Sequence, residues 1–215
     1  MGFGPQLKKP PNRSDFYDFF MTIIVLIRHG ETDWNIEGRY QGQADPPLNA
    51  RGVLQAQQLA AELRNSDLQI LYTSPLLRAK QTAQILADGL GIPEIDEPRL
   101  MEIHQGDWQT RLRSEIEALY PEIFKNWETN PWQITPPGGE HLSEVQTRVT
   151  AAIDDILRRN IHQKIGFVTH RIPIALIKVR YQDLDPDIVR SIHLPNAYWE
   201  EISIPSPEDS TSKTK

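Results

Sequence analysis

The feature that most constrains the fold is a run of five apolar residues, 23–27, that ends abruptly in Arg28, His29 and Gly30. Four of the five are β-branched, and a short run of this composition is typical of a strand buried on both faces of a parallel sheet. In open α/β sheets the carboxyl ends of such strands line the ligand crevice. The run therefore predicts that Arg28 and His29 lie in a binding site.

The residue types at this strand end suit an anion. Arg28 offers a rigid fork of donors for phosphate or carboxylate, and Gly30 allows the backbone to turn or to approach a ligand closely. A neutral imidazole beside a bound phosphate can attack the phosphorus and form a phosphohistidine. The alternative is that His29 is only a hydrogen-bonded histidine at a strand end.

Length, charge and composition narrow the function classes. The 215 residues suffice for one α/β domain and are few for two. The net charge is -6 and the basic residues are scattered, unlike those of a nucleic-acid-binding protein. The chain has no cysteine, which excludes disulfides and fits a reducing compartment. The apolar run 19–27 is too short to span a bilayer. We expect a cytoplasmic protein with no nucleic-acid or membrane partner, and a homodimer remains open.

The two ends of the chain differ from its centre. Residues 1–20 contain three prolines, two glycines and no periodic apolar face, which predicts a flexible N-terminal extension. Phe16, Tyr17, Phe19 and Phe20 offer an alternative, an arm that packs against a partner. Residues 205–215 have no large apolar side chain and are rich in Ser, Thr and Pro, which predicts a disordered tail. The folded domain is expected to span residues 21–204.

Between these ends, predicted strands alternate with predicted helices. Strands are expected at 68–72, 164–169 and 197–204, in addition to the opening run. Helices are expected at 50–63, from 75 to about 90, at 142–156 and at about 173–181, because apolar residues recur there with helical spacing or because capping residues mark a helix start. The alternation predicts a single three-layer α/β domain, with a mainly parallel sheet and helices on both faces.

Two intervening segments have less regular patterns. Residues 33–49 are rich in turn formers and are expected to form a loop that carries binding groups. Residues 111–130 support one or two helices, with Pro121 either bending one helix or starting a second. Their apolar stripe is predicted to be core. It consists of Ile116, Leu119, Ile123 and Trp127.

Polar residues also follow two later strands. Ser74 and Pro75 suit the start of a helix, which would place Arg78 in a first turn, where free N–H groups and the helix dipole already favour anions. The alternative for Arg78 is a solvated helix arginine. His170 ends the strand at 164–169, as His29 ends the first strand. The three strand ends form one crevice if their strands are neighbours.

Glu102 lies among apolar residues. Such surroundings favour the protonated form of a carboxyl group, which suits a general acid. The alternative is an ordinary surface glutamate in a loop.

An ordered series of motifs then resembles the histidine phosphatase superfamily, which includes the phosphoglycerate mutases. The resemblance covers residues 22–204. Its motifs are LIRHGET at 26–32, RYQG at 39–42, SPL at 74–76 followed by Arg78, Glu102, PGGE at 137–140, VTH at 168–170 and LPNA at 194–197.

The resemblance implies a role for each matching residue. His29 would accept the phosphoryl group, and Glu102 would protonate the leaving oxygen and then activate water. Three side chains would hold the phosphoryl oxygens: Arg28, Arg78 and His170. Three further residues would line the phosphate and leaving-group side: Asn35, Gln41 and Gly42. No metal or cofactor is expected, since the arginines occupy the place of a magnesium ion.

The chain departs from the family pattern at two places. Arg171 follows His170, where glycine is usual, and Gln109-Thr110 follow Trp108, where Glu-Gly is common. The N–H of residue 171 can still reach a phosphate if its dihedral angles do not require glycine. The added guanidinium either strengthens anion binding or obstructs the pocket.

The predicted activity is hydrolysis of a small phosphorylated metabolite by a metal-independent phosphomonoesterase. The segment between Glu102 and Pro137 is short beside the insertion that covers the site in mutases, so a mutase is the second reading. A third is a non-catalytic phosphate-binding protein in which Arg171 has spoiled the site. A metal site built from His29, Glu102 and His170 is disfavoured, because two adjacent guanidiniums would repel the cation.

Overall fold

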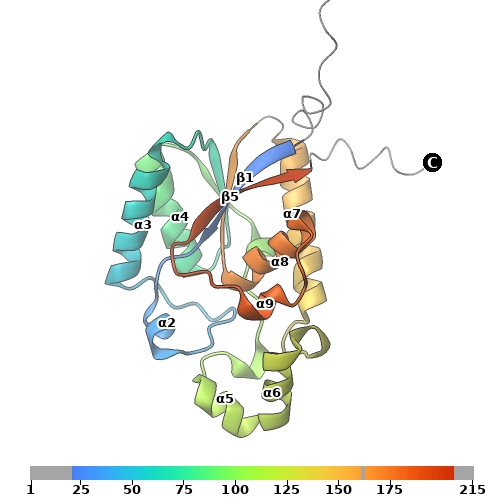
Figure 1. The fold of residues 1–215 in the computed structure, drawn as a ribbon. Helices are drawn as coiled ribbons and strands as arrows, with labels where there is room; N and C mark the ends of the chain where they lie inside the picture. Colours follow the sequence, from blue (N-terminus) through green and yellow to red (C-terminus); the bar gives the residue numbers. More distant parts are fainter. Residues whose placement is uncertain (1–20, 161–162, 206–215) are drawn as a thin grey trace, which may run out of the picture.

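The computed structural model describes residues 21–160 and 163–205 (Figure 1). The predicted N-terminal extension and most of the predicted tail lie outside these residues. No helix of the described part is long and apolar enough to cross a membrane.

A five-stranded sheet forms the centre of the molecule, with the order β3-β2-β4-β1-β5. All neighbours pair in parallel except β1 and β5, which are antiparallel. The sequence prediction of an α/β domain with a mainly parallel sheet is confirmed. The strands are β1 (Met21–Arg28), β2 (Ile70–Thr73), β3 (Glu94–Asp96), β4 (Ile165–Thr169) and β5 (Trp199–Pro205).

The register of the sheet brings the three predicted strand ends together. Arg28 of β1 lies opposite Thr169 of β4, and Thr73 of β2 lies opposite Val168 on the other side of β4. Because the three strands run in parallel, the residues that follow them emerge at one edge. The crevice expected from the sequence therefore forms.

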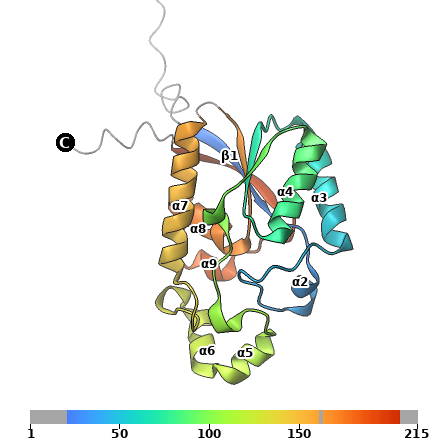
Figure 2. The ribbon, with the colours of Figure 1, turned by 180° about the vertical axis from the view of Figure 1, so that it is seen from behind.

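Helices cover both faces of the sheet, as Figures 1 and 2 show from opposite sides. Alternate residues of β1 point to opposite faces: Val25 and Ile27 belong to the apolar cluster of α3 and α4, whereas Ile24 and Leu26 belong to that of α7 and α8. This gives the predicted three layers. The four covering helices are α3 (Ala50–Glu62), α4 (Leu77–Leu90), α7 (Leu142–Arg159) and α8 (Arg171–Gln182).

Short helices gather beyond the carboxyl ends of the parallel strands, at the lower end of the molecule in Figure 1. They are α2 (Asp33–Glu37), α5 (Arg113–Leu119), α6 (Pro121–Thr129) and α9 (Ile188–Ser191). Single 3₁₀ turns complete the fold. They are η1 (Leu63–Asn65), η2 (Pro98–Leu100), η3 (Gly106–Trp108) and η4 (Pro131–Gln133).

Several local predictions are wrong. The expected loop at 33–49 begins with helix α2, because Thr32 and Asn35 form a reciprocal capping box. Helix α4 begins at Leu77 with Leu76 as its N-cap, two residues later than the Ser74-Pro75 start, although Arg78 still lies in the first turn. Strand β3 was not among the predicted strands, since this short edge strand has little apolar sequence.

The predicted core stripe of residues 111–130 is half correct. Ile116 and Trp127 are buried, but Leu119 is 56% exposed and Ile123 is 38% exposed. Pro121 starts a new helix rather than bending one, so the helical phase changes there and Phe124 takes the buried position.

Candidate active site

A pocket of about 230 Å³ opens at the carboxyl ends of β1, β4 and β2. Arg28, His29, Arg78 and Glu102 line it, together with residues from α2, α6, α8 and α9. Five arginines and two glutamates contribute, so the pocket is cationic. The charged lining residues are Arg28, Arg39, Arg78, Arg171, Arg190, Glu102 and Glu128.

His29 is held in one tautomer by its own neighbour. Its Nδ1 lies 2.7 Å from the carbonyl oxygen of Gly30, and a carbonyl only accepts, so Nδ1 carries the hydrogen and Nε2 keeps its lone pair. The ring is 3% exposed. Burial, and then the charges of Arg78 and Arg28, lower the pKa of His29 well below 6.5. His29 is therefore neutral at physiological pH, as a nucleophile must be.

His170 lies against His29, with ring centroids 5.1 Å apart. It is fully buried behind the pocket lining, and its Nε2 is 2.8 Å from the hydroxyl of Ser74. Its Nδ1 is buried and has no hydrogen-bond partner in the described part of the chain. Burial is the main cause that lowers the pKa of His170. Ser74, which the sequence suggested only as a helix cap, instead orients this imidazole.

Two buried guanidiniums flank His29. Arg78 is 1% exposed and donates to the carbonyl oxygens of Ala44 (2.9 Å) and Gly42 (2.7 Å), while Arg28 donates to that of Leu194. Burial lowers the pKa of each to about 10, so both are cations at neutral pH. Neither forms an ion pair within residues 21–160 and 163–205, and the Nε of each is unpartnered there. Buried charges of this kind favour a bound anion.

Glu102 faces the same pocket from the loop after η2. Burial raises its pKa above 4.5, despite the opposing influence of the Ile103 N–H and of three arginines. That N–H donates to Oε1 at 2.9 Å. The surroundings thus favour a protonated carboxyl group, as the sequence predicted.

Arg148 of α7 holds the loop that carries Glu102. Its guanidinium donates to the carbonyl oxygens of Arg99 (2.7 Å), Met101 (2.7 Å) and Glu102 (3.0 Å), and it pairs with Glu140 at 2.9 Å.

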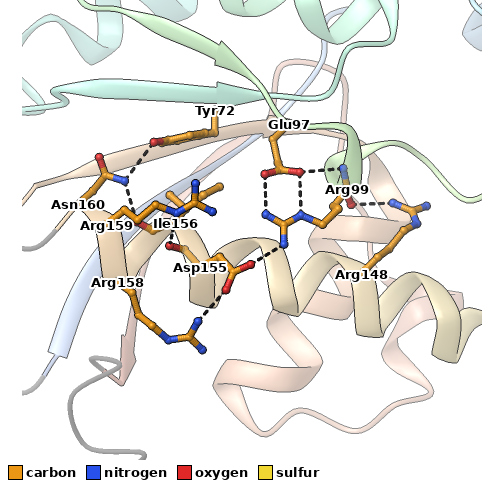
Figure 3. A network of polar contacts seen from close by, with 9 residues as sticks. All are labelled: Tyr72, Glu97, Arg99, Arg148, Asp155, Ile156, Arg158, Arg159 and Asn160. Atoms are coloured by element: carbon orange, nitrogen blue, oxygen red, sulfur yellow. Dashed lines mark hydrogen bonds and ion pairs between the residues drawn. The ribbon is translucent and has the colours of Figure 1, made fainter.

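Figure 3 shows how this contact continues along α7. Arg99 pairs with Glu97 (2.8 Å) and with Asp155 (2.7 Å), so the turn before Glu102 is tied to the helix at two places. No role was predicted for Arg148 from the sequence, because three of its partners are backbone carbonyls that no residue pattern reveals.

The predicted substrate-binding residues all line the pocket: Asn35, Gln41, Gly42 and Arg171. The Oδ1 of Asn35 accepts from Asn196 at 3.1 Å, which ties α2 to the segment before β5. Gln41 is 9% exposed, and its Oε1 has no partner in the described part. Gly42 has a φ of 52° and would clash with Gln109 if it carried a Cβ.

Gly30 is required for a close contact within the fold. A Cβ at this position would lie 2.6 Å from the carbonyl oxygen of Gly52, at the start of α3. The glycine therefore permits packing between the end of β1 and α3, and its N–H donates to Thr82 at 3.0 Å.

Comparison with known proteins places the chain in a family. Residues 24–211 match the model of the histidine phosphatase superfamily, branch 1. The chain belongs to this superfamily. It is 38% identical over 182 residues to phosphoserine phosphatase 1 of Hydrogenobacter thermophilus, covering 85% of this chain and 86% of the relative.

Other superfamily members agree. The chain is 35% identical to a probable phosphoglycerate mutase, GpmB, of Yersinia enterocolitica, with 82% of each covered. It superposes on the structure of a mycobacterial glucosyl-3-phosphoglycerate phosphatase with a TM-score of 0.77 and 28% identity, covering 84% of this chain and 90% of the other.

The two departures noted in the sequence differ in their backbone conformation. Arg171 is the first residue of α8 and has no positive φ, so its backbone does not require glycine. Its Nη2 donates to the carbonyl oxygens of Val189 (2.9 Å) and Arg190 (3.1 Å), which holds the side chain in the pocket wall. Thr110 has a φ of 72°, a left-handed conformation that is unfavourable for a β-branched residue.

Proposed function

We propose that this protein is a phosphatase that hydrolyses a small phosphomonoester through a phosphohistidine on His29. The observation that carries the proposal is a neutral His29 whose Nδ1 is bonded to Gly30, set between two guanidiniums that form no ion pair within residues 21–160 and 163–205, and near a carboxyl group whose pKa is raised. The superfamily membership and the phosphatase names of two relatives support it.

In the first half-reaction, Nε2 of His29 attacks the phosphorus and the bond to the leaving oxygen breaks. Glu102 gives its proton to that oxygen, which leaves as an alcohol. Arg28 and Arg78 hold the equatorial oxygens and neutralise their charge through the transition state. We assign the unpartnered Nδ1 of His170 to a further oxygen. Asn35, Gln41 and Gly42 line the remaining side.

In the second half-reaction, the Glu102 carboxylate takes a proton from water as the water oxygen attacks phosphorus. The phosphorus–nitrogen bond breaks, inorganic phosphate forms, and His29 regains its lone pair. One carboxyl group thus serves as acid and then as base. Arg148 keeps that group in place for both steps.

We also propose that turnover needs no metal ion. The two guanidiniums beside His29 already supply positive charge where the phosphoryl oxygens would lie, and they disfavour a divalent cation at the same place. Two expectations from the sequence stay predictions: a cytoplasmic location, and the lack of a nucleic-acid or membrane partner. Whether the protein forms a homodimer stays open.

The first test is turnover of O-phosphoserine and other small phosphomonoesters in the presence of EDTA. We expect release of phosphate, and loss of this release in His29→Ala because the variant lacks the nitrogen that accepts the phosphoryl group. His193→Ala, which removes an exposed histidine outside the pocket, is the matched control. Undiminished turnover by His29→Ala would falsify the mechanism.

Two further readouts separate the alternatives. With 3-phosphoglycerate and a trace of the bisphosphate, isomer formation without free phosphate would identify a mutase, the activity named for one relative. An acid-labile, base-stable phosphoryl label on His29 supports the covalent route. Tight phosphate binding without label from any donor would instead indicate a non-catalytic binding protein.

A further inference from the structure

Arg171 is a cation in the pocket that the proposed phosphoryl transfer does not use. Its Nη2 is occupied by the carbonyl oxygens of Val189 and Arg190, which fixes the side chain against α9. Its Nε and Nη1 donate to no group in residues 21–160 and 163–205, and no carboxylate there forms an ion pair with it. A half-buried guanidinium is thus held in the wall with donors to spare.

The position of Arg171 separates it from the phosphoryl site. Its guanidinium is fixed against α9, which lies with the other short helices beyond the carboxyl ends of the parallel strands (Figure 1). His29, by contrast, directly follows β1, and Arg78 lies in the first turn of α4. Arg171 therefore lies on the outer side of the pocket, where the leaving group would sit.

The part of the pocket lining near Arg171 carries a second cation, and the acidic residue there is already paired. Arg190, exposed at the end of α9, also lines the pocket. The wall's acidic residue, Glu128, is already paired with Arg113 at 2.7 Å. The leaving-group side thus retains positive charge after Arg28 and Arg78 have been assigned to the phosphate.

We propose that Arg171, assisted by Arg190, binds a carboxylate on the leaving group, so that the substrates are compact phosphate esters of hydroxycarboxylic acids. This inference rests on the proposed phosphatase function and names its substrate class. The pocket volume of about 230 Å³ lies below the ~300–1,000 Å³ of pockets for drug-sized ligands, which fits a leaving group of a few carbons. A charged hydrogen bond to the carboxylate would favour such substrates over neutral ones.

Matched substrates test this directly. O-phosphoserine and O-phosphoethanolamine differ by one carboxylate, as 3-phosphoglycerate and glycerol 3-phosphate differ at one end. In Arg171→Gln we expect kcat/KM for the two carboxylates to fall roughly tenfold to a hundredfold, the usual effect of losing one charged hydrogen bond. The other two substrates should change little. Arg158→Gln, an exposed arginine on α7 remote from the pocket lining, is the control and should leave all four unchanged.

Two results overturn the proposal. An equal loss on both members of each pair would mean that Arg171 contacts the transferred phosphate. A larger loss with propane-1,3-diol bisphosphate than with either carboxylate would mean that the group recognised is a second phosphate.

A binding measurement keeps the proposal separate from the proposed activity. In the His29→Ala background, calorimetry with phosphoserine and phosphoethanolamine needs no turnover. Tighter binding of phosphoserine that disappears in Arg171→Gln supports the carboxylate site, even if the wild-type protein hydrolyses none of the four esters and the phosphatase function fails. Equal affinity for the two ligands overturns the carboxylate site, even if both are hydrolysed.

Discussion

At the scale of single residues, burial shifts the pKa values of two groups of the candidate site in opposite directions. Burial, and then Arg78 and Arg28, lower the pKa of His29, whereas burial raises the pKa of Glu102. Both shifts favour the protonation states that the proposed mechanism requires, an unprotonated imidazole and a protonated carboxyl group.

This pairing predicts the pH dependence of Glu102→Gln. The variant cannot donate a proton, so kcat for an alkyl phosphate should fall roughly 10²–10⁴-fold at mildly acidic pH. The ratio of wild-type to variant kcat should shrink as pH rises through the raised pKa of Glu102, because the wild type then also lacks the proton. Comparing the two proteins cancels ionisation of the substrate.

Two controls accompany that experiment. Glu117→Gln removes an exposed carboxylate on α5 and should leave the profile unchanged. The leaving groups are compared in a single turnover, which ends before water attacks the phosphohistidine. In that turnover the loss with p-nitrophenyl phosphate, whose leaving group needs little protonation, should be much smaller. An equal loss with both leaving groups would remove Glu102 from the role of acid.

At the scale of elements, α7 positions the acid through the turn that precedes it. Arg148 bonds to three successive parts of that turn, and Thr169 at the end of β4 donates to the carbonyl oxygen of Leu100 at 2.6 Å. The loop is thus fixed between a helix and the strand that leads to His170. Arg148 acts through Glu102 and touches no reacting atom in this account.

Weakening this attachment should change catalysis selectively. We expect Arg148→Lys, which keeps the charge but loses the planar fork, to lower kcat for alkyl phosphates about tenfold or more with a smaller change in KM. Combined with Glu102→Gln it should add little further loss, since both changes remove the same proton transfer. Arg158→Gln on the same helix is the control. Fully additive losses of kcat in the double variant would show that Arg148 acts independently of Glu102.

The elements also show what a sequence can and cannot predict. The strands that deliver His29 and His170 were predictable, because buried parallel strands are short, apolar and β-branched and end sharply. The exposed side of α5 and α6 was not, because Pro121 resets a periodicity that the sequence shows as continuous. The convergence of the strand ends followed from parallel topology. The direction of Arg171 did not, because carbonyls of α9 determine it.

At the scale of the whole molecule, burying two neutral histidines makes stability depend on pH. The folded pKa values of His29 and His170 lie well below 6.5, so between those values and 6.5 the unfolded chain binds more protons than the folded one. The free energy of unfolding then rises with pH, by up to about 1.4 kcal/mol per pH unit for each histidine. Above pH 6.5 the two histidines are neutral in both states and do not change the free energy of unfolding. As pH falls below 6.5, they lower it.

Urea denaturation from about pH 5 to 8 measures this effect. We expect the wild-type free energy of unfolding to fall below pH 6.5 more steeply than that of the His29→Asn/His170→Asn variant. Above pH 7 the difference between the two proteins should be constant. Glu102, whose raised pKa acts with the opposite sign, is common to both proteins. Parallel curves throughout would contradict the assignment of buried neutral imidazoles.

The strand order has a consequence for synthesis of the protein. Among the described strands, β1, which carries Arg28 and leads into His29, pairs with β4 and β5, and Ile24 lies opposite Ile165 and Ile202. A ribosome makes β1 early, and both of its neighbours follow only near the end of the domain. The apolar strand must remain unpaired in the nascent chain over that interval, when such segments are prone to aggregate. Chaperones that bind exposed apolar segments would bind β1 during this interval, before β4 and β5 have formed the sheet that surrounds His29.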